Sequence, residues 1–417
     1  MNKPVTKYLA LSALAAATMA QAEVLDRPSG IKIGERLTLR PQVSAAVTYD
    51  SNVDANSGRA TDSRKDDCLW TVMPSLGLDY AAENWSLLLS AYYSYRQYFD
   101  NSHRNYDHHN YGESLRWTWS NSLRNEKGWS VILAQSFQQV TMAEDMVLDG
   151  GSNYTGDQRQ LDVSGAVQRR ITEMLHAEVS AGYHWLDYMN DDNNRTSYYG
   201  WDRWQVGGEV GFAPSKWTDL LVSGSYMGYT QDNMANSGLP DESNGYSVQA
   251  GLGSYMTERI SYRALAGWSR FEYADDMSSS DGFVYTLSAN WKIDETWNTM
   301  FLASSYYQPS ERQYATQTRV DSVSWGLGKV LVRGKLRATL DVRYRREEHE
   351  YALKGADWDY TLDIWTGRIG ADYTLNRFVG LFAYCEYQNS SNDKAKERRG
   401  AYDYDRCRVT VGMKLTY

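Results

Sequence analysis

The feature that most constrains this chain is a strict alternation of apolar and polar residues, which first appears in LTLRPQVSAAVTYD at positions 37–50. The odd positions are apolar or aromatic and most even positions are polar, so the stretch predicts a β-strand with two different faces. It is more than twice as long as the mean globular strand of about five or six residues. A strand of this length with one apolar face is typical of a barrel that crosses a membrane.

The same alternation continues to the last residue of the chain. It is as clear in LWTVMPSLGLDY at 69–80 and in NWSLLLSAYYSY at 84–95 as in the first stretch. The further segments begin near Ser114, Trp129, Gln160, Leu175, Trp204, Trp217, Tyr246, Ile260, Phe283, Trp297, Val320, Leu336, Tyr360, Phe378 and Arg406. Together they predict a single all-β domain of about 18 strands.

The connectors between these segments alternate in length. Short ones such as AAEN (81–84) and VRGK (332–335) alternate with long polar ones such as QDNMANSGLPDESNG (231–245). Short turns at one end and long loops at the other predict an antiparallel up-and-down barrel, with periplasmic turns, extracellular loops and both termini in the periplasm. Tryptophans near both strand ends, such as Trp129 and Trp268, agree with two aromatic belts. The alternative is a secreted soluble β-protein, which predicts neither uniformly long strands nor this rhythm of connectors.

The N-terminus carries the features of a secretory signal peptide over residues 1–22. Lys3 and Lys7 precede an apolar stretch, and Ala20-Gln21-Ala22 gives the small-x-small pattern of a cleavage site. We expect residues 23–36 to form a short periplasmic segment and residues 37–417 to form the barrel. No later stretch has the about 20 apolar residues of a membrane-spanning helix.

Charge and cysteine content exclude two classes of protein. The net charge of −9 argues against a nucleic-acid partner, which requires a basic patch. Three cysteines do not make a disulfide framework. Cys385 and Cys407 are equidistant from the centre of the last long loop and share the outward parity, so we expect them to be cross-strand neighbours. Whether they are bridged stays open, and Cys68 is expected to be unpaired.

Two short motifs carry a family resemblance. The chain ends in TVGMKLTY, in which Gly412, Leu415 and Tyr417 resemble the closing-strand signal of bacterial outer-membrane barrels. RPQVSAAVTYDSNV at 40–53, with its Tyr49-Asp50-x-Asn52 motif, resembles the start of the β-barrel porin type 2 family of outer-membrane proteins. The resemblance implies residence in the outer membrane of a Gram-negative-type bacterium, contact with its lipid and insertion by the barrel assembly machinery. It implies no catalytic residues.

The polar face of the predicted strands carries charged side chains. An arginine or lysine that faces lipid at mid-depth costs about 2–4 kcal/mol, so strand parity assigns these charges to the lumen. The predicted pore-lining residues are Arg40, Arg96, Arg116, Asp162, Glu178, Arg263, Arg337, Asp341, Arg343 and Arg345. RATLDVRYRRE at 337–347 predicts a basic ladder along one strand. A lumen enclosed by about 18 strands is too wide for side chains alone to fill.

No metal or cofactor is expected. Residues 50–56 resemble the start of a calcium loop, but Ala55 and Thr61 stand where an EF-hand needs Gly and Glu. Capping of the loop by Asp and Asn side chains is the better interpretation. MNDDNNRTS at 189–197 receives the same interpretation, and cations bound in such loops stay an open alternative.

The histidines do not predict an enzyme. The adjacent His108 and His109 point to opposite sides of an extended chain, which favours a solvated loop. The sequence contains no Gly-x-Ser-x-Gly elbow. His103 near Asp100 is the nearest approach to a catalytic pair, and we expect no catalytic activity.

The sequence therefore predicts a porin-like channel for passive diffusion of small hydrophilic solutes, with sugars or exported polysaccharide as finer options. The basic ladder predicts a weak preference for anions. The alternative is a structural or adhesive barrel that presents its surface loops without transport. The Gly-rich outward stretch VGGEVGF at 206–212 is the only hint of a homotrimer contact.

Overall fold

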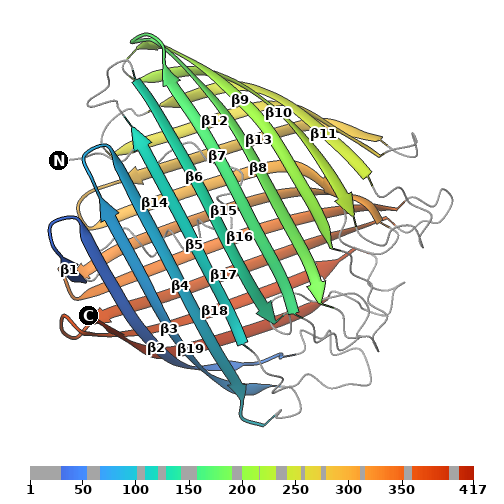
Figure 1. Cartoon of the computed structure of the whole chain (residues 1–417). Helices are drawn as coiled ribbons and strands as arrows, with labels where there is room; N and C mark the ends of the chain where they lie inside the picture. The colour runs from blue at the N-terminus through green and yellow to red at the C-terminus, as the bar shows by residue number, and fades with distance from the viewer. Residues whose placement is uncertain are drawn as a thin grey trace.

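The chain folds into a closed antiparallel β-barrel, shown as a computed structural model in Figure 1. The structure describes residues 30–53, 66–100, 109–120, 128–141, 157–189, 200–215, 217–231, 242–254, 259–273, 279–309, 315–351, 359–393 and 403–417. The predicted signal peptide lies outside these residues. No helix in the described ranges is long and apolar enough to span a membrane.

The barrel wall consists of 18 strands. These are β2 (Leu37–Asp50), β3 (Asp67–Ala81), β4 (Trp85–Tyr98), β5 (His109–Ser120), β6 (Gly128–Thr141), β7 (Asp157–Arg170), β8 (Leu175–Met189), β9 (Trp201–Ser215), β10 (Thr218–Gln231), β11 (Glu242–Ser254), β12 (Ile260–Tyr273), β13 (Ser279–Lys292), β14 (Trp297–Pro309), β15 (Ala315–Val332), β16 (Leu336–Tyr351), β17 (Tyr360–Thr374), β18 (Val379–Asn392) and β19 (Tyr404–Thr416). A short β1 (Ile31–Ile33) pairs with the start of β2.

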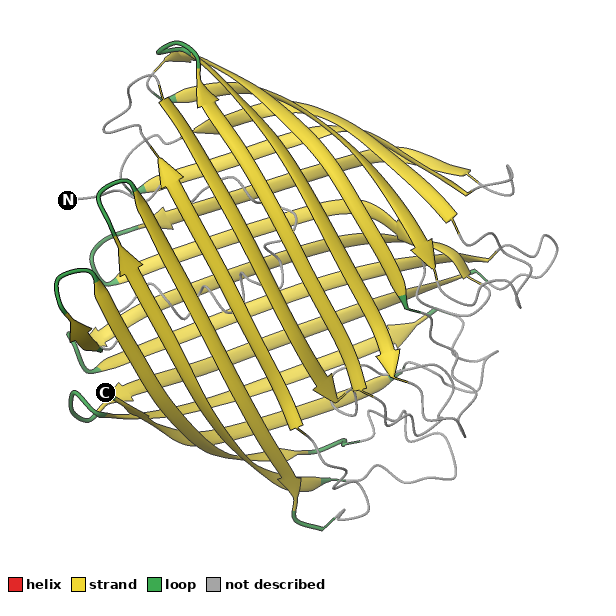
Figure 2. Cartoon of the chain, in the orientation of Figure 1, coloured by secondary structure: helices red, strands yellow, loops and turns green. Residues whose placement is uncertain are grey.

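Each wall strand pairs with its neighbours in sequence, and β19 pairs with β2 to close the ring. The pairing Gly412↔Ala46 lies in the middle of this closing contact. The predicted fold class, strand number and closing pair are confirmed. Figure 2 shows the strands crossing the whole barrel at a common tilt.

The two faces of each strand follow the predicted alternation. The apolar parity is exposed on the outer wall, where Val179 is 62% exposed, Ile369 61% and Val411 58%. Such an apolar outer surface is the lipid-facing face of a transmembrane barrel. Most predicted strand starts on the long-loop side are late, by up to five residues, as at Ser114 for His109 and Val320 for Ala315. The reason is that outward charges such as Arg346 and Glu348 interrupt the alternation there, whereas the backbone ladder continues.

Three of the short turns share a side-chain cap. Asp294 Oδ1 accepts hydrogen bonds from the backbone nitrogens of Thr296 (2.6 Å) and Trp297 (2.9 Å). Asn376 and Thr172 cap their own turns in the same way. An Asp, Asn or Thr oxygen thus satisfies the donors that a tight turn leaves open. These hydrogen bonds, chiefly with Thr296, lower the pKa of the exposed Asp294 carboxyl below its ordinary value of 3.8.

The wall is not uniform on the long-loop side. Pairing between β13 and β14 ends at Tyr285↔Ser305, although β13 continues along β12 to Ser279 and β14 continues along β15 to Pro309. Beyond this point Tyr307 of β14 packs against a cluster from the inner faces of β8, β9, β10 and β12. The cluster consists of Leu186, Trp201, Tyr229, Phe271 and Tyr273. The end of β14 therefore separates from β13 and lies against the inside of the wall.

Candidate channel lumen

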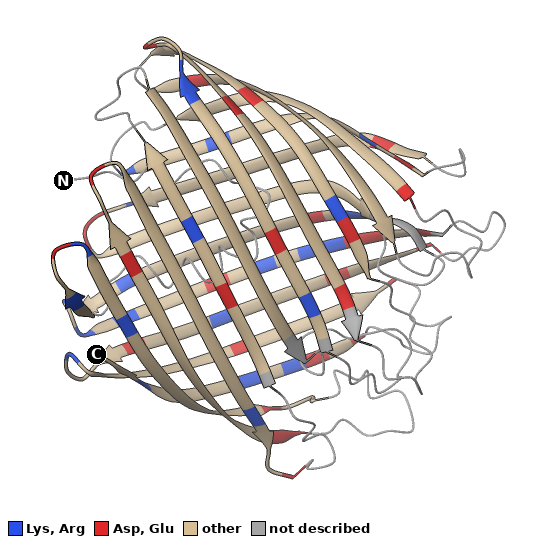
Figure 3. Cartoon of the chain, viewed as in Figure 1, with Lys and Arg blue, Asp and Glu red and all other residues tan. Residues whose placement is uncertain are grey.

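One side of the lumen, formed by β16–β19 and β2–β4, is densely charged. Its inward positions hold nine Arg or Lys and seven Asp or Glu residues, and we call this surface the charged wall (Figure 3). The residues are Arg40, Asp50, Asp67, Asp79, Arg96, Arg337, Asp341, Arg343, Arg345, Glu347, Arg368, Asp372, Glu386, Arg406, Arg408 and Lys414. Its net charge is therefore positive.

Most charges on this wall are paired with an opposite charge on the same strand or on a strand one or two positions away. Arg40 Nε lies 2.7 Å from Asp79 Oδ2, and Lys414 Nζ lies 3.1 Å from Asp372 Oδ1. Arg408 donates to Glu386 in the same manner. Pairing of this kind lets a water-filled interior carry many charges without a large net field, because each guanidinium or ammonium offsets a carboxylate.

The most buried pair is Arg406 with Asp50, near the closing contact of the barrel. Arg406 Nε donates to Asp50 Oδ1 at 3.0 Å and to Oδ2 at 2.9 Å, and Nη2 donates to Oδ2 as well. The side chains are 4% and 0% exposed. Asp50 also accepts from the backbone nitrogen of Asn52 at 3.0 Å. The expected Asx capping at the start of this loop is thus observed, while residues 54–61 lie outside the described part.

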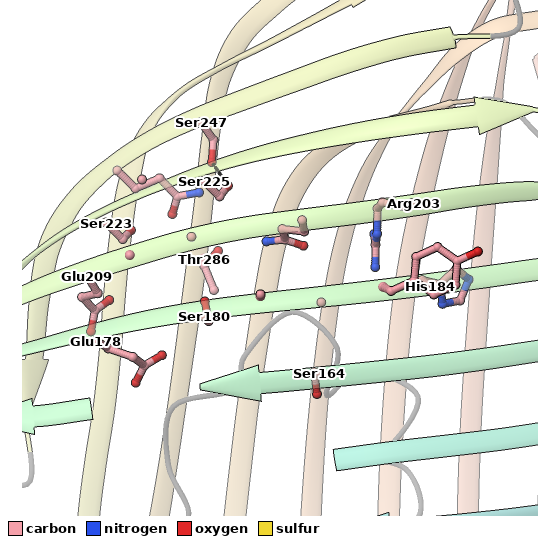
Figure 4. Close-up of a pocket in the computed structure, with 18 of the residues that line it drawn as sticks. Ser164, Glu178, Ser180, His184, Arg203, Glu209, Ser223, Ser225, Ser247 and Thr286 are labelled. Carbon is pink, nitrogen blue, oxygen red and sulfur yellow. Dashed lines mark hydrogen bonds between the residues drawn. The ribbon is translucent and has the colours of Figure 1, made fainter. Parts of the chain in front are cut away.

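The opposite side of the lumen has a different chemistry. A recess of about 140 Å³ is formed by inward residues of β7–β13, and we call it the serine recess. Six serine or threonine side chains line it, namely Ser164, Ser180, Ser223, Ser225, Ser247 and Thr286. Figure 4 shows Glu178 and Glu209 at one end of the recess, His184 and Arg203 at the other, and the hydroxyls between them.

Charges in the serine recess are fewer and less evenly paired. Arg263 donates to both carboxylate oxygens of Glu209, with Nη1 3.0 Å from Oε1. His184 Nδ1 lies 2.5 Å from Asp162 Oδ1, and the His184 ring packs against Trp201. Glu178 has no hydrogen bond or ion pair within the part of the chain that the structure describes.

The ten residues predicted to line a pore all lie at inward positions. The structure brings Asp162, Glu178 and Arg263 together in the serine recess. It brings Asp341 close to Arg337 and Arg343 on β16 and to Arg368 on β17. The others are separate. Arg345 contacts Glu347, Arg40 contacts Asp79, Arg96 lies near Tyr92, and Arg116 is on β5. Their role in conduction stays a prediction.

The assembly motif lies at the closing contact. Leu415 is opposite Val43, and the backbone nitrogen of Tyr417 donates to Pro41 O at 3.3 Å. A Cβ atom on Gly412 would lie 2.6 Å from Ala45 O. Close packing in the wall therefore already requires a glycine at position 412.

Cys385 and Cys407 are cross-strand neighbours on the outer face, as expected, at diagonal rather than directly opposed positions. Cys385 lies opposite Val409, and Cys407 lies opposite Tyr387, so the two cysteines are diagonal neighbours on the outer face. All three cysteines are free thiols. Diagonal positions lie about 7–8 Å apart, beyond the usual Cα separation of a disulfide. The offset arises because the pairing of β18 with β19 is centred on position 397, as in Val379↔Leu415, whereas the two cysteines are centred on position 396.

Sequence reasoning missed one buried polar cluster. Thr318 Oγ1 lies 2.9 Å from His349 Nδ1, and His349 Nε2 lies 3.0 Å from Glu347 Oε2. The order resembles a nucleophile, base and acid, but Thr318 is only 2% exposed. A substrate cannot reach a hydroxyl buried in this way, so the cluster ties β15 to β16. The alternation on β16 places Glu347 and His349 inward, but nothing in the sequence indicates Thr318 as their partner.

Several residues that the sequence analysis considered for catalysis or cation binding are not described by the structure. His103, His108 and residues 190–197 lie outside the described part of the chain. Among the residues that are described, no group of three or more His, Cys, Asp or Glu side chains could hold a metal ion.

The closed ring, the apolar outer face and the charged interior define a porin-like β-barrel of the outer membrane. Residues 222–417 match the family described as "Putative beta-barrel porin 2", so the resemblance inferred from the sequence is confirmed over the C-terminal part of the chain.

Several solved barrels have similar folds. The copper transporter OprC is 9% identical, with a TM-score of 0.47, over 93% of this chain and 82% of that one. OccAB3 of Acinetobacter baumannii is 9% identical, with a TM-score of 0.43, over 91% of this chain and 99% of that one. No curated protein matches the chain in sequence.

Proposed function

We propose that this barrel is a passive channel for small hydrophilic solutes in the outer membrane. The observation that carries the proposal is the closed 18-strand ring whose inward positions are polar on both sides of the lumen. A ring of this size holds more space than its inward side chains fill. Sugars, or a polysaccharide chain in transit, would find hydroxyl and carboxylate partners along the serine recess.

The charges of the lumen favour a weak preference for anions. The charged wall carries two more positive than negative residues, and its ladder of Arg337, Arg343 and Arg345 follows one strand. Charges on a low-dielectric wall focus their field into the lumen. Because most arginines are paired with carboxylates, the preference is expected to be small.

The proposed partners are the barrel assembly machinery and outer-membrane lipid, and no catalytic activity is proposed. The barrel assembly machinery would insert the chain through its closing strand, and the exposed apolar outer face would contact outer-membrane lipid. The chain would carry out no reaction, since its only triad-like arrangement in the described part ends in the buried Thr318.

Conductance in planar lipid bilayers tests the channel. The folded, heat-modifiable barrel should produce discrete current steps in potassium chloride, and a salt gradient should give a reversal potential that favours chloride. The second candidate is a structural barrel without transport, which the aromatic cluster under the long-loop end of β8–β12 favours because it fills part of the mouth. A correctly folded barrel that is silent at all voltages would support that candidate and overturn the channel.

A further inference from the structure

The serine recess contains a carboxylate that the protein itself leaves uncompensated. Glu178 lies on β8 opposite Glu209 of β9, and Arg263 of β12 is the cation whose charge acts on it. Arg263 is already engaged by both oxygens of Glu209. A second carboxylate beside a saturated ion pair is repelled by the first, and this repulsion raises the free energy of the empty recess.

The net formal charge of the recess, like that of Glu178, is negative. Its lining includes three carboxylates, from Asp162, Glu178 and Glu209, and two guanidinium groups, from Arg203 and Arg263. The formal charges of the lining side chains other than His184 therefore sum to minus one. The strand order places β8–β12 nine strands away from β17–β19 and β2–β3, so the negative recess faces the positive charged wall across the lumen. A cation is therefore drawn toward the recess and away from that wall.

The rest of the lining selects for hydroxyl groups. The side chains between the two ends of the recess are mainly serines (Figure 4), and the amides of Gln205 and Gln249 also line it. Hydroxyl and amide groups both donate and accept hydrogen bonds, as the hydroxyls of a polyol do. A neutral polyol would leave the charge of Glu178 uncompensated, and an anion would be repelled by Glu178 and Glu209.

We propose that the serine recess binds small hydroxylated amines, with the ammonium group on Glu178 and the hydroxyl groups along the serines and glutamines. This inference rests on the proposed channel, of which it names a preferred solute class. Bound solute would occupy the recess and briefly obstruct the lumen. The recess would then act as a subsite on the pathway, at which basic polyols pause while chloride uses the opposite wall.

The test compares three solutes that share a six-carbon polyol chain. N-methylglucammonium, sorbitol and gluconate are positive, neutral and negative, and each is titrated by calorimetry into the folded full-length barrel in detergent at constant ionic strength. We expect N-methylglucammonium to bind at least about tenfold more tightly than sorbitol, since a hydrogen bond to a charged group contributes more than a neutral one. Equal binding of sorbitol, or tighter binding of gluconate, would overturn the proposal.

Two variants locate the site. Glu178→Gln removes the negative charge without changing the side-chain shape, and we expect a loss of about tenfold in affinity for N-methylglucammonium. Asp372→Asn removes one negative charge from the charged wall, where Asp372 pairs with Lys414, and should change that affinity by less than about twofold. Equal losses in the two variants, or none in Glu178→Gln, would overturn the assignment, provided that both proteins show heat-modifiable migration.

The titration separates this inference from the channel itself. A barrel that conducts chloride but does not bind N-methylglucammonium would retain the proposed function and lose the subsite. A barrel that binds it through Glu178 but conducts no current would retain the binding site and lose the channel, and with it the claim that the recess lies on a transport pathway.

Discussion

The two sides of the lumen are both polar, but different side chains make them so. On the charged wall, arginines and carboxylates from adjacent strands neutralise one another in pairs such as Arg408 with Glu386. In the serine recess, polar character comes from hydroxyl groups, and its few charges leave Glu178 uncompensated. The comparison shows that inward parity fixes only that a residue meets water. The residues on neighbouring strands determine whether its charge is paired within the wall or can interact with a solute.

The two designs also differ in what they contribute to stability. A buried ion pair makes a small net contribution to the free energy of folding, but removal of one partner leaves the other charge buried and unpaired. A hydrogen bond between two serine hydroxyls, such as Ser225 and Ser247 at 2.9 Å, contributes little to stability. Its removal leaves only one neutral hydroxyl without a partner. Point changes on the charged wall should therefore have larger effects on folding than those in the serine recess.

The largest effect is expected at the buried pair near the closing contact. Arg406→Ala leaves the fully buried Asp50 carboxylate without its guanidinium, and the free energy of unfolding should fall by about 3–5 kcal/mol. Urea unfolding of the barrel in lipid vesicles, followed by tryptophan fluorescence, measures the loss. The double variant Arg406→Met with Asp50→Leu should recover much of it, and an unchanged midpoint for Arg406→Ala would show that this pair is already compensated by other groups.

The next effect concerns ion selectivity. Replacing Arg337 and Arg343 by Glu reverses two charges of the ladder, and the chloride-to-potassium permeability ratio should fall by about tenfold, the lower end of what a charged low-dielectric cleft achieves. The reversal potential in a salt gradient reports the ratio. Arg346→Glu is the matched control, because Arg346 lies on the same strand and faces outward, where it pairs with Glu348. An equal shift in the control would mean that strand parity does not decide selectivity.

A smaller effect is expected in the serine recess. Ser225→Ala removes one hydroxyl of the Ser225–Ser247 pair, and the free energy of unfolding should fall by about 1 kcal/mol or less because water can replace the lost partner. The same urea titration measures it. A loss as large as that of Arg406→Ala would remove the energetic distinction between the two sides.

The smallest effect concerns a turn outside both surfaces and depends on pH. Because the folded-state pKa of Asp294 is lowered, its stabilisation is present above the ordinary carboxyl pKa and is lost as the pH falls through the folded value. Asp294→Asn keeps an acceptor but removes the charge, so it should be slightly less stable than wild type near neutral pH. The difference should vanish as the pH falls below the ordinary carboxyl pKa of 3.8 and through the lower folded-state pKa. Parallel urea midpoints at the two pH values check this, and a difference that grows on acidification would reverse the expected sign.

The sequence was sufficient for the fold because the period of two is a local property. It predicted the number of strands, the closing pair and the face of each pore-lining residue from one stretch of chain at a time. Contacts that join distant strands were not predictable. The pairing of Arg263 with Glu209 spans 54 positions and skips two intervening strands, so it depends on the curvature of the wall rather than on parity.

Register was the other limit. The diagonal placement of Cys385 and Cys407 differs from direct opposition by two residues, which is the smallest shift that keeps every side chain on its own face. Alternation cannot detect such a shift, because the pattern of each strand is unchanged by it. The separation of β13 from β14 was missed for the same reason, since both strands alternate normally on either side of Tyr285 and Ser305.

That separation gives the two rims of the barrel different mechanics. The short-turn rim is a continuous hoop, whose circumference is fixed by the strands hydrogen-bonded around it. The opposite rim is interrupted between β13 and β14, whose ends overlap. Tyr307 of β14 lies against the inner side of β13 at Gly282. A Cβ atom on Gly282 would lie 2.5 Å from the Tyr307 hydroxyl. A hoop changes width only by breaking hydrogen bonds, whereas overlapping ends slide on side-chain contacts. The long-loop rim can therefore widen or narrow while the short-turn rim keeps its diameter.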